Sequence, residues 1–163
     1  DRVKMACLAQ LVNVIAPIFT ERGGRVLKQS IFYPFQQVSL YGRGKAMRVL
    51  TKTDLLASEH YGEVPALQTA AAYDEAAGIV TVFVLNCTQQ EALDFTLDLR
   101  SFGSVQMVEH QVMQGDDIYA QNTFAEPDRV VPYKKGLTTA ETDGAYHWQL
   151  EPLSWHVLRF SVE

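Results

Sequence analysis

The sequence predicts a mostly β protein, in which a β-sandwich of jelly-roll type follows a helix-strand-helix piece of an α/β barrel or doubly wound sheet. After residue 48, about eight short alternating or β-branched runs are separated by turn signals, a pattern typical of two packed sheets. Before it, one continuous apolar run lies between two helical patterns. We therefore divide the 163 residues into a part from 1 to 47 and a part from 48 to 163.

The first part starts with a helical pattern and then a buried-strand pattern. Asp1 can cap a helix over Arg2–Leu11, whose residues are apolar almost all round, so we expect this helix to be buried. The run Asn13–Thr20 predicts a strand covered on both faces. Because one buried strand cannot form a sheet, we expect its neighbours in residues upstream of Asp1, which this chain does not contain.

The rest of the first part predicts a loop and then a helix. A Gly-Gly pair indicates a loop over Glu21–Ser30. Pro34 is typical of the first turn of a helix, and Gly42 is typical of its end. Aromatic residues are frequent here, and we expect most of them to pack in a barrel wall rather than to stack on sugar rings. They are Phe19, Phe32, Tyr33, Phe35 and Tyr41.

The second part reads as all-β. Phe95, Leu97 and Leu99 alternate with polar residues, and Ile79–Leu85 is apolar and β-branched enough for a central strand. Gln114–Asp128 is long and polar, and is expected to be a surface excursion. The predicted strands are Arg48–Ala57, Leu67–Tyr73, Ile79–Asn86, Leu93–Leu99, Ser104–Met113, Val130–Thr138, Ala145–Leu150 and Trp155–Val162.

Composition argues against several classes of function. Lysine and arginine number 14 against 19 aspartates and glutamates, and a net charge of −5 argues against a nucleic-acid partner. No run approaches the roughly 18 apolar residues of a membrane span. Cys7 and Cys87 are expected to be buried free thiols, which suits a reducing, cytoplasmic compartment. Without a CxxC motif or a Cys/His cluster, we expect no metal and no cofactor.

Most other chemically capable residues are best interpreted as structural. The histidines lack metal-ligand spacing: they are His60, His110, His147 and His156. Asp116-Asp117 is a weak calcium signal, better interpreted as a solvated loop. Ser154 lacks the elbow motif of a serine nucleophile and merely precedes a strand. Asn86-Cys87-Thr88 fits a glycosylation pattern but ends an apolar run, so we interpret it as a strand terminus.

Glu21 is the acidic residue placed most like an active group, because it follows the apolar strand at the end where barrel enzymes position such groups. Glycoside hydrolysis needs two carboxylates facing one bond, and no other acidic residue of this part is placed to partner it. Two interpretations stay open, a catalytic role or a loop charge paired with Arg22 or Arg25.

Five segments carry a resemblance that covers essentially the whole chain in order: Leu8–Ile18, Gln29–Phe35, Tyr41–Gly44, Leu97–Phe102 and Leu153–Arg159. Together they resemble the C-terminal portion of the family 51 glycoside hydrolases, the α-L-arabinofuranosidases. The resemblance implies that residues 1–47 are the last part of a (β/α)8 catalytic barrel and that residues 48–163 form the C-terminal sandwich.

The resemblance also implies where the chemistry lies. The family uses a retaining mechanism with two glutamates, and both lie upstream of Asp1, so this chain has no catalytic residue and should be inactive alone. A family glutamine that contacts the arabinosyl unit is matched by Gln29. Leu27 stands where family members often have a tryptophan. From its position alone, Gln29 could equally be a loop amide that caps the helix near Pro34.

The function implied for the parent enzyme is removal of terminal non-reducing α-L-arabinofuranosyl residues from arabinosides. The expected partners are an arabinose-containing oligosaccharide or polysaccharide, the rest of the barrel, and further copies in a homo-oligomer, without nucleic acid or membrane. The rival interpretation is a non-catalytic carbohydrate-binding sandwich. Trp148 and Trp155 argue against it, because they alternate with polar neighbours as core residues do. A purely structural sandwich that covers the barrel is the third interpretation.

Overall fold

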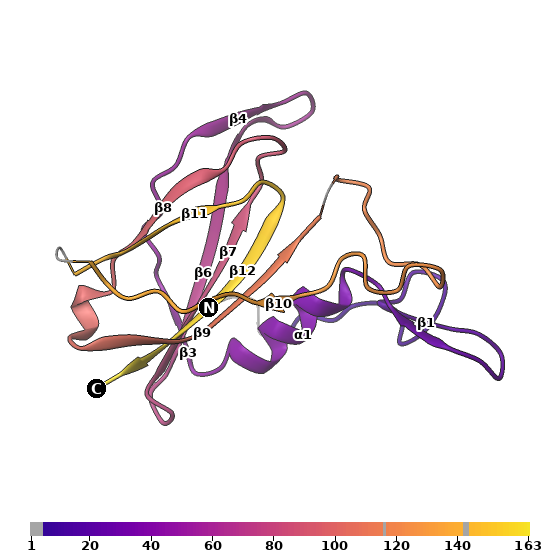
Figure 1. The fold of residues 1–163 in the computed structure, drawn as a ribbon, viewed down its shortest axis with the longest axis horizontal. Helices are drawn as coiled ribbons and strands as arrows, with labels where there is room; N and C mark the ends of the chain where they lie inside the picture. Colours follow the sequence, from indigo (N-terminus) through magenta and orange to yellow (C-terminus); the bar gives the residue numbers. More distant parts are fainter. Residues whose placement is uncertain (1–4, 116, 142–143) are drawn as a thin grey trace.

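A six-stranded antiparallel sheet dominates the structure, a computed structural model that describes residues 5–115, 117–141 and 144–163 (Figure 1). Its strand order is β10-β9-β12-β7-β6-β3. The central strands β7 and β12 are paired over eight residue positions, which places the most apolar segments of the chain in the middle of the sheet. The strands are β10 (Tyr133–Lys134), β9 (Val105–Gln114), β12 (Ser154–Val162), β7 (Ile79–Asn86), β6 (Leu67–Asp74) and β3 (Lys45–Met47).

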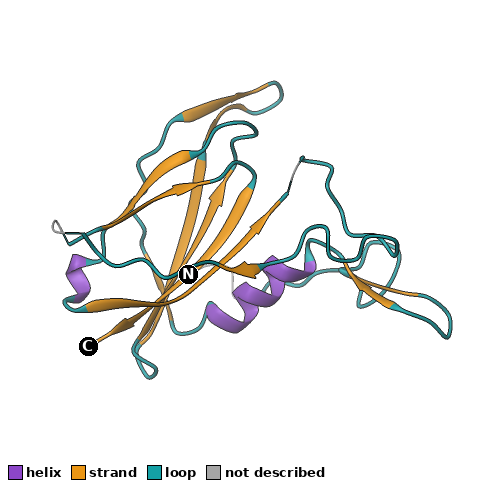
Figure 2. Cartoon of the chain, in the orientation of Figure 1, coloured by secondary structure: helices purple, strands orange, loops and turns teal. Residues whose placement is uncertain are grey.

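A smaller sheet covers one face of the large one. It consists of β8 (Leu93–Leu97) paired with β11 (Tyr146–Leu150), and both lie over the same side of the large sheet (Figure 2). Leu158 and Phe160 of the large sheet meet Phe95 of the small sheet in one buried cluster. The mostly β fold and the inward face of Phe95, Leu97 and Leu99 are therefore confirmed.

Two further elements complete the second part. β4 (Leu55–Ser58) and β5 (Gly62–Pro65) form a separate hairpin, which projects at the top of Figure 1. The 3-10 turn η1 (Arg100–Phe102) follows β8 and closes one end of the core. No helix of the described residues is long and apolar enough to cross a membrane.

The helix predicted around Pro34 is confirmed as α1 (Phe32–Tyr41). It packs on the outer face of the large sheet, opposite the small sheet (Figure 1). A sharp corner then leads into β3, where Gly44 has φ +85° and a side chain would overlap the carbonyl oxygen of Tyr73. β3, which precedes the expected division at residue 48, pairs with β6 at the edge of the large sheet.

The predicted buried helix and buried strand at the start of the chain are wrong for the described residues. Met5–Leu11 is not helical, and of Asn13–Thr20 only β1 (Ile18–Thr20) is a strand; residues 1–4 of the predicted helix lie outside the described residues. Val14 and Ile15 are 78% and 65% exposed. An apolar segment becomes regular mainly by packing, and no described residue covers these side chains.

The predicted loop Glu21–Ser30 is also wrong in part, because it contains β2 (Val26–Lys28). This strand pairs with β1 in a hairpin, with Phe19 opposite Leu27. Gly23, at φ +65°, supplies the left-handed residue of the tight connection. The glycine pair therefore marks a hairpin turn rather than a long loop.

Two of the predicted strands are shorter in the structure than the sequence pattern indicates. Arg48–Ala57 is strand only from Leu55 onward, and Val130–Thr138 only at Tyr133–Lys134. β10 is the edge strand of the large sheet and pairs with β9 over only two residues. Residues 48–54 belong to no strand of the described part of the chain. Both cysteines are free as expected, but the predicted burial is wrong, since Cys7 is exposed and Cys87 is half-buried.

Candidate functional site: the Gln29 loop and its support

Gln29 lies between β2 and α1, with its backbone fixed on both sides. Its amide N–H donates to the carbonyl oxygen of Pro17 at 2.8 Å, and its carbonyl oxygen accepts from the Phe32 N–H at 2.9 Å. Ile31 is the N-cap residue of α1, and no side chain caps the helix. The backbone of Gln29, and not its side-chain amide, therefore satisfies the start of the helix.

Asn122 anchors the hairpin that carries Gln29. Its side-chain amide donates to the carbonyl oxygens of Lys28 and Val130, both at 3.0 Å, and its oxygen accepts from the Val130 N–H at 2.7 Å. Asn122 is only 1% exposed, so these bonds lie in a desolvated environment. The excursion expected over Gln114–Asp128 thus returns to hold the strand next to Gln29.

Leu27 occupies the hairpin position where the resemblance implies a tryptophan. Its side chain is buried, while its neighbour Val26 is exposed. A buried leucine cannot present a flat face to a sugar ring, because stacking needs an aromatic surface open to the ligand. Any sugar contact from this loop would therefore come from a residue other than Leu27.

Glu21 is a paired loop charge, which confirms that interpretation. Both of its carboxylate oxygens accept from the Arg25 guanidinium at 3.1 Å. These hydrogen bonds lower the pKa of the Glu21 carboxyl. Because a general acid in glycoside hydrolysis needs a raised pKa, the pairing disfavours that catalytic role for Glu21. Arg25 also donates to the Phe124 carbonyl oxygen at 2.7 Å, so the pair ties the hairpin to the excursion.

A polar network fixes α1 on the large sheet. Gln37 is buried, accepts from Trp155 Nε1 at 2.7 Å and donates to Gln111 Oε1 at 2.7 Å. In the same network, Arg159 Nη1 lies 2.8 Å from Glu109 Oε2, and the Arg159 guanidinium carbon lies 4.5 Å from the centre of the Tyr41 ring. Burial would raise the pKa of Glu109, but hydrogen bonds from Arg159 and Gln111 outweigh it and lower that pKa. The network sets the orientation of α1, and with it the position of the Gln29 loop.

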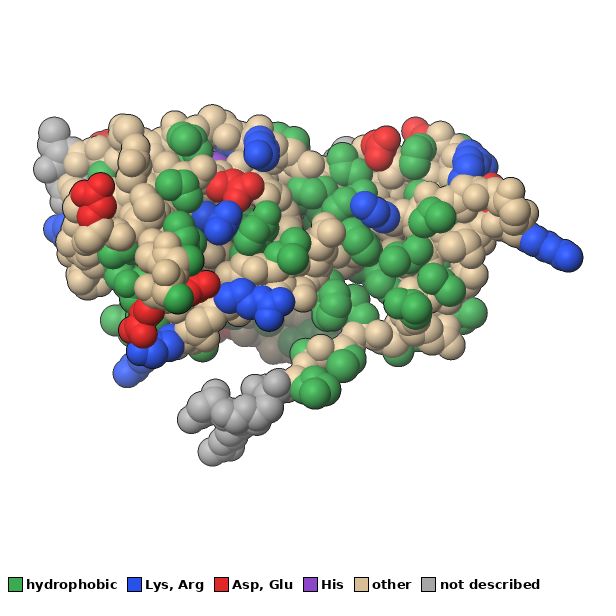
Figure 3. All heavy atoms as spheres, turned by 90° about the horizontal axis from the view of Figure 1, so that it is seen from below, with side chains coloured by type: hydrophobic (Ala, Val, Ile, Leu, Met, Phe, Trp, Pro, Cys, Tyr) green, Lys and Arg blue, Asp and Glu red, His purple; other side chains and the backbone are tan. Residues whose placement is uncertain are grey.

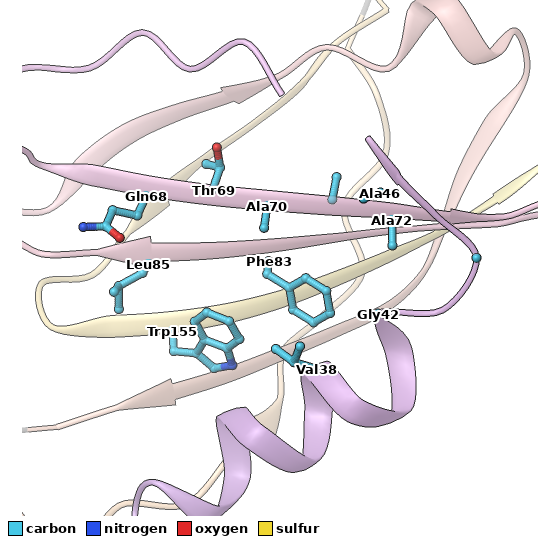
Figure 4. A pocket seen from close by; sticks show the side chains of 12 residues that line it. Val38, Gly42, Ala46, Gln68, Thr69, Ala70, Ala72, Phe83, Leu85 and Trp155 are labelled. Atoms are coloured by element: carbon cyan, nitrogen blue, oxygen red, sulfur yellow. The ribbon is translucent and has the colours of Figure 1, made fainter. Parts of the chain in front are cut away.

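A groove of about 380 Å³ lies between α1 and the same face of the sheet. Figure 4 shows Val38 of α1 facing Phe83 and Trp155, with Ala70 and Ala72 beside them. The Phe83 and Trp155 rings are stacked, 5.7 Å apart and 17° from parallel. Trp155 therefore lies on the outer face of the sheet, whereas Trp148 packs on the core as predicted. The expectation that both tryptophans are core residues is wrong for Trp155.

The remaining candidate residues are mostly structural, as predicted. Ser154 is buried in a strand, and Asn86 is fully buried with its amide bonded to the carbonyl oxygens of Leu150 and Glu151. Such an asparagine is closed to glycosylation. Asp117 pairs with Arg129 at 3.2 Å, while Asp116 lies outside the described residues. Within the described part of the chain, no three His, Cys, Asp or Glu side chains gather as metal ligands would.

Sequence reasoning missed one pair of histidines. His110 and His156 lie on neighbouring strands, both are buried, and Nε2 of His110 lies 3.0 Å from Nδ1 of His156. They are 46 residues apart in sequence, so only the antiparallel register of β9 and β12 brings them together. His147 lies on the outer face of the small sheet, 3.1 Å from the Thr96 hydroxyl.

Comparison with known proteins places the chain in one family. The model of the alpha-L-arabinofuranosidase C-terminal domain matches residues 1–154. The chain is 43% identical over 159 residues to an intracellular exo-alpha-(1->5)-L-arabinofuranosidase of Halalkalibacterium halodurans, covering 98% of the chain and 31% of that protein. It is 40% identical over 163 residues to one from Bacillus subtilis, covering 100% of the chain and 32% of that protein.

A solved structure agrees with this placement. The family 51 α-L-arabinofuranosidase of Bifidobacterium longum superimposes with a TM-score of 0.87 at 32% identity, over 98% of this chain and 31% of that one. The chain therefore spans about a third of the length of the relatives it matches. It belongs to the α-L-arabinofuranosidase C-terminal domain family, and corresponds to the C-terminal portion of a family 51 enzyme.

Proposed function

We propose that this chain is the accessory C-terminal part of a retaining α-L-arabinofuranosidase, which removes terminal non-reducing arabinofuranosyl residues from arabinosides. The observation that carries the proposal is identity of about 40% along the whole chain to enzymes named exo-α-L-arabinofuranosidases. The chain spans only a third of their length, so the catalytic glutamates belong to the upstream barrel, and the parent enzyme acts in the cytoplasm on arabinose-containing oligosaccharides or polysaccharides.

The described residues from 5 to 40 support an upstream barrel as the partner of this chain. Hydrophobic side chains gather on the side that Figure 3 shows, viewed from below Figure 1. Large exposed apolar surfaces mark interaction sites in globular proteins. The exposed large hydrophobic residues of this part are Met5, Leu8, Leu11, Val12, Val14, Ile15, Val26, Ile31, Phe35, Val38 and Leu40. We assign residues 1–47 to the barrel and residues 48–163 to the sandwich, with β3 at the end of the first range joining the two through its pairing with β6. We also assign the sandwich an additional role in oligomer contacts.

Within this proposal Gln29 is the substrate contact. Its backbone is fixed between Pro17 and Phe32, and its side chain is half-buried rather than fully enclosed. An amide offers donors and an acceptor, which suits the hydroxyls and ring oxygen of a furanose, but it cannot act as acid or base. Its role is therefore to hold the sugar in register with the two upstream carboxylates.

The test is Gln29→Ala in the longer enzyme that contains this chain, assayed with an aryl α-L-arabinofuranoside. Loss of one hydrogen bond in a desolvated pocket costs about 1–3 kcal/mol, so kcat/KM should fall roughly ten- to a hundredfold. Gln36→Ala is the matched control, because Gln36 is exposed on α1. Unchanged kcat/KM with unchanged thermal melting would leave Gln29 without a role in binding, and an inactive longer enzyme would contradict the proposed activity itself.

The groove beneath α1 favours a second candidate, a non-catalytic carbohydrate-binding surface. Trp155 reaches this groove from the outer face, and Gln68 and Thr69 supply polar groups beside it. Against it, Phe83 is 4% exposed and the Trp155 N–H is already bonded to Gln37, so little aromatic face is free to stack on a sugar. Depletion of the chain by insoluble arabinan, abolished by Trp155→Ala but not by Trp148→Phe, would favour this candidate.

A further inference from the structure

A series of buried hydrogen bonds runs along the large sheet, from Ser154 and His156 on β12 to His110 on β9. The Ser154 hydroxyl lies 2.9 Å from His156 Nε2, and His156 Nδ1 lies 3.0 Å from His110 Nε2. All three side chains are at most 2% exposed. The two imidazole rings are 5.3 Å apart, one on β12 and one on β9.

A backbone carbonyl group determines the direction of each hydrogen bond in this series. The Ser154 hydroxyl bonds to the carbonyl oxygen of Glu151, and a carbonyl can only accept, so the hydroxyl proton is used there. Ser154 Oγ must then accept from the Nε2–H of His156. In a neutral His156 ring, Nδ1 is consequently bare and accepts from the Nε2–H of His110. When both rings are neutral, each therefore carries its proton on Nε2.

This assignment leaves a bare nitrogen, Nδ1, on the His110 ring, which lies near Trp148 of the second sheet. His110 Nδ1 is buried without a hydrogen-bond partner among the described residues, and so is Nε1 of Trp148 on β11. The two rings are 5.8 Å apart across the interior. His110 therefore packs against the small sheet through uncharged contacts, at a position where an added proton would meet an indole and no acceptor.

We propose that His110 and His156 form a proton-sensitive latch that holds the two sheets of the sandwich together while both rings are neutral. A proton added to His110 Nδ1 creates an unpaired buried charge between β9 and β11. A proton added to His156 Nδ1 destroys the acceptor of the His110 bond. Either event favours separation of the small sheet, because opening lets the charged ring reach water.

The charged groups around the latch do not offset such a proton. Lys135, which follows β10 and whose N–H donates to the His110 carbonyl oxygen at 2.9 Å, repels positive charge on both rings. Glu109 and Arg159 neighbour the pair on β9 and β12, but they bond to each other on the outer face. The inward neighbours from β7 and β12 are apolar, Val84 and Leu158.

The sign of the pH effect follows from the two states. Burial, reinforced by Lys135, lowers the pKa of His110 to about 4, and burial, His110 and Lys135 lower that of His156 to about 3. Unfolded histidines take up protons from about pH 6.5 downward. Unfolding therefore absorbs protons below that pH, so stability present above about pH 6.5 is lost as the pH falls toward the two folded values.

Urea unfolding of the 163-residue chain between about pH 5.5 and 7 tests the latch, because carboxylates are ionised in both states there. Near pH 5.5 the dependence of the unfolding free energy on pH should correspond to the uptake of about two protons on unfolding. His110→Gln keeps a donor for His156 without a titrating group, and should reduce the uptake to about one. His60→Gln is the matched control, since His60 is exposed, and should leave two. Equal slopes in all three proteins would overturn the proposal.

If His110→Gln does not fold, a measurement on the unaltered chain tests the proposed latch instead. Two-bond nitrogen–proton spectra distinguish the ring tautomers and the charged form of each histidine. The latch predicts that His110 and His156 both carry Nε2–H at pH 7 and remain neutral at pH 5. A proton on Nδ1 of either ring at pH 7, or titration of both near pH 6.5, would overturn the latch.

Discussion

Apolar residues are buried in the sandwich but largely exposed in the first part of the chain. In the sandwich, Leu158 and Phe160 are fully buried between two sheets. In the first part, Leu11 and Val14 belong to equally apolar stretches, yet they are 81% and 78% exposed. The sandwich covers its apolar side chains within the described residues, whereas Met5, Leu11, Val14 and Ile15 are left exposed there. Apolar sequence alone therefore predicts a need for burial, and the regular element forms only where a covering surface is present.

The largest effect expected from this comparison concerns activity. Under the proposed function, the pair of carboxylates that a retaining glycosidase needs lies in the upstream barrel, so we expect that the isolated chain does not hydrolyse an aryl α-L-arabinofuranoside. Loss of the catalytic groups typically removes several orders of magnitude in rate. The measurement is release of the aryl alcohol by the repurified 163-residue chain. Turnover that survives repurification would contradict the assignment of catalysis to the upstream barrel.

One substitution of an apolar residue in each part measures the difference in burial directly. Phe160→Ala leaves a cavity in the sandwich and should reduce the free energy of unfolding by about 3–5 kcal/mol. Leu11→Ala removes an exposed side chain and should change it by less than about 0.5 kcal/mol. Urea denaturation followed by circular dichroism provides both values. A comparable loss in the two variants would mean that the first part is covered in solution.

The attachment of α1 to the sheet should show an intermediate effect. Gln37→Leu leaves the Trp155 N–H without its acceptor, at a cost of about 1–3 kcal/mol. We expect limited proteolysis of this variant to cut within the first part and to leave residues 48–163 intact. Gln36→Leu, on the exposed side of the helix, is the control. Cleavage that starts within Ile79–Leu99 instead would contradict the proposed division of the chain.

The smallest effect is expected at Gln29 itself. In the isolated chain Gln29→Ala should change the melting temperature little, corresponding to less than about 0.5 kcal/mol, because its backbone bonds do not depend on the side chain. The same substitution is expected to reduce kcat/KM in the longer enzyme. Differential scanning calorimetry is the measurement here. A marked loss of stability would assign the Gln29 side chain to the fold rather than to substrate.

Sequence patterns predicted the elements whose stabilising contacts are regular. Ile79–Asn86 matches β7 at both ends, because a β-branched run bounded by turn residues leaves little alternative. Pro34 and Gly42 likewise located α1. The candidate site depends on the family pattern around Gln29, since the residues alone also allowed a helix cap.

The features that sequence could not supply depend on partners distant along the chain. The His110–His156 pair requires the register of β9 against β12, and Trp155 faces outward because α1 covers that side. The helix prediction failed over Met5–Leu11 for the opposite reason, since the apolar pattern is real but the described residues provide nothing for it to pack against. Tertiary context, rather than local propensity, decided each of these positions.

The corner at Gly44 has a consequence for how the two parts move. Its backbone lies directly against Tyr73 in a left-handed conformation, and β3 is already paired with the sheet one residue later. Because this connection has no free residues, α1 and the sandwich should move together as one rigid unit. A movement of the sandwich would then displace the Gln29 loop together with α1, and the orientation of the sandwich would control the position of the proposed substrate contact.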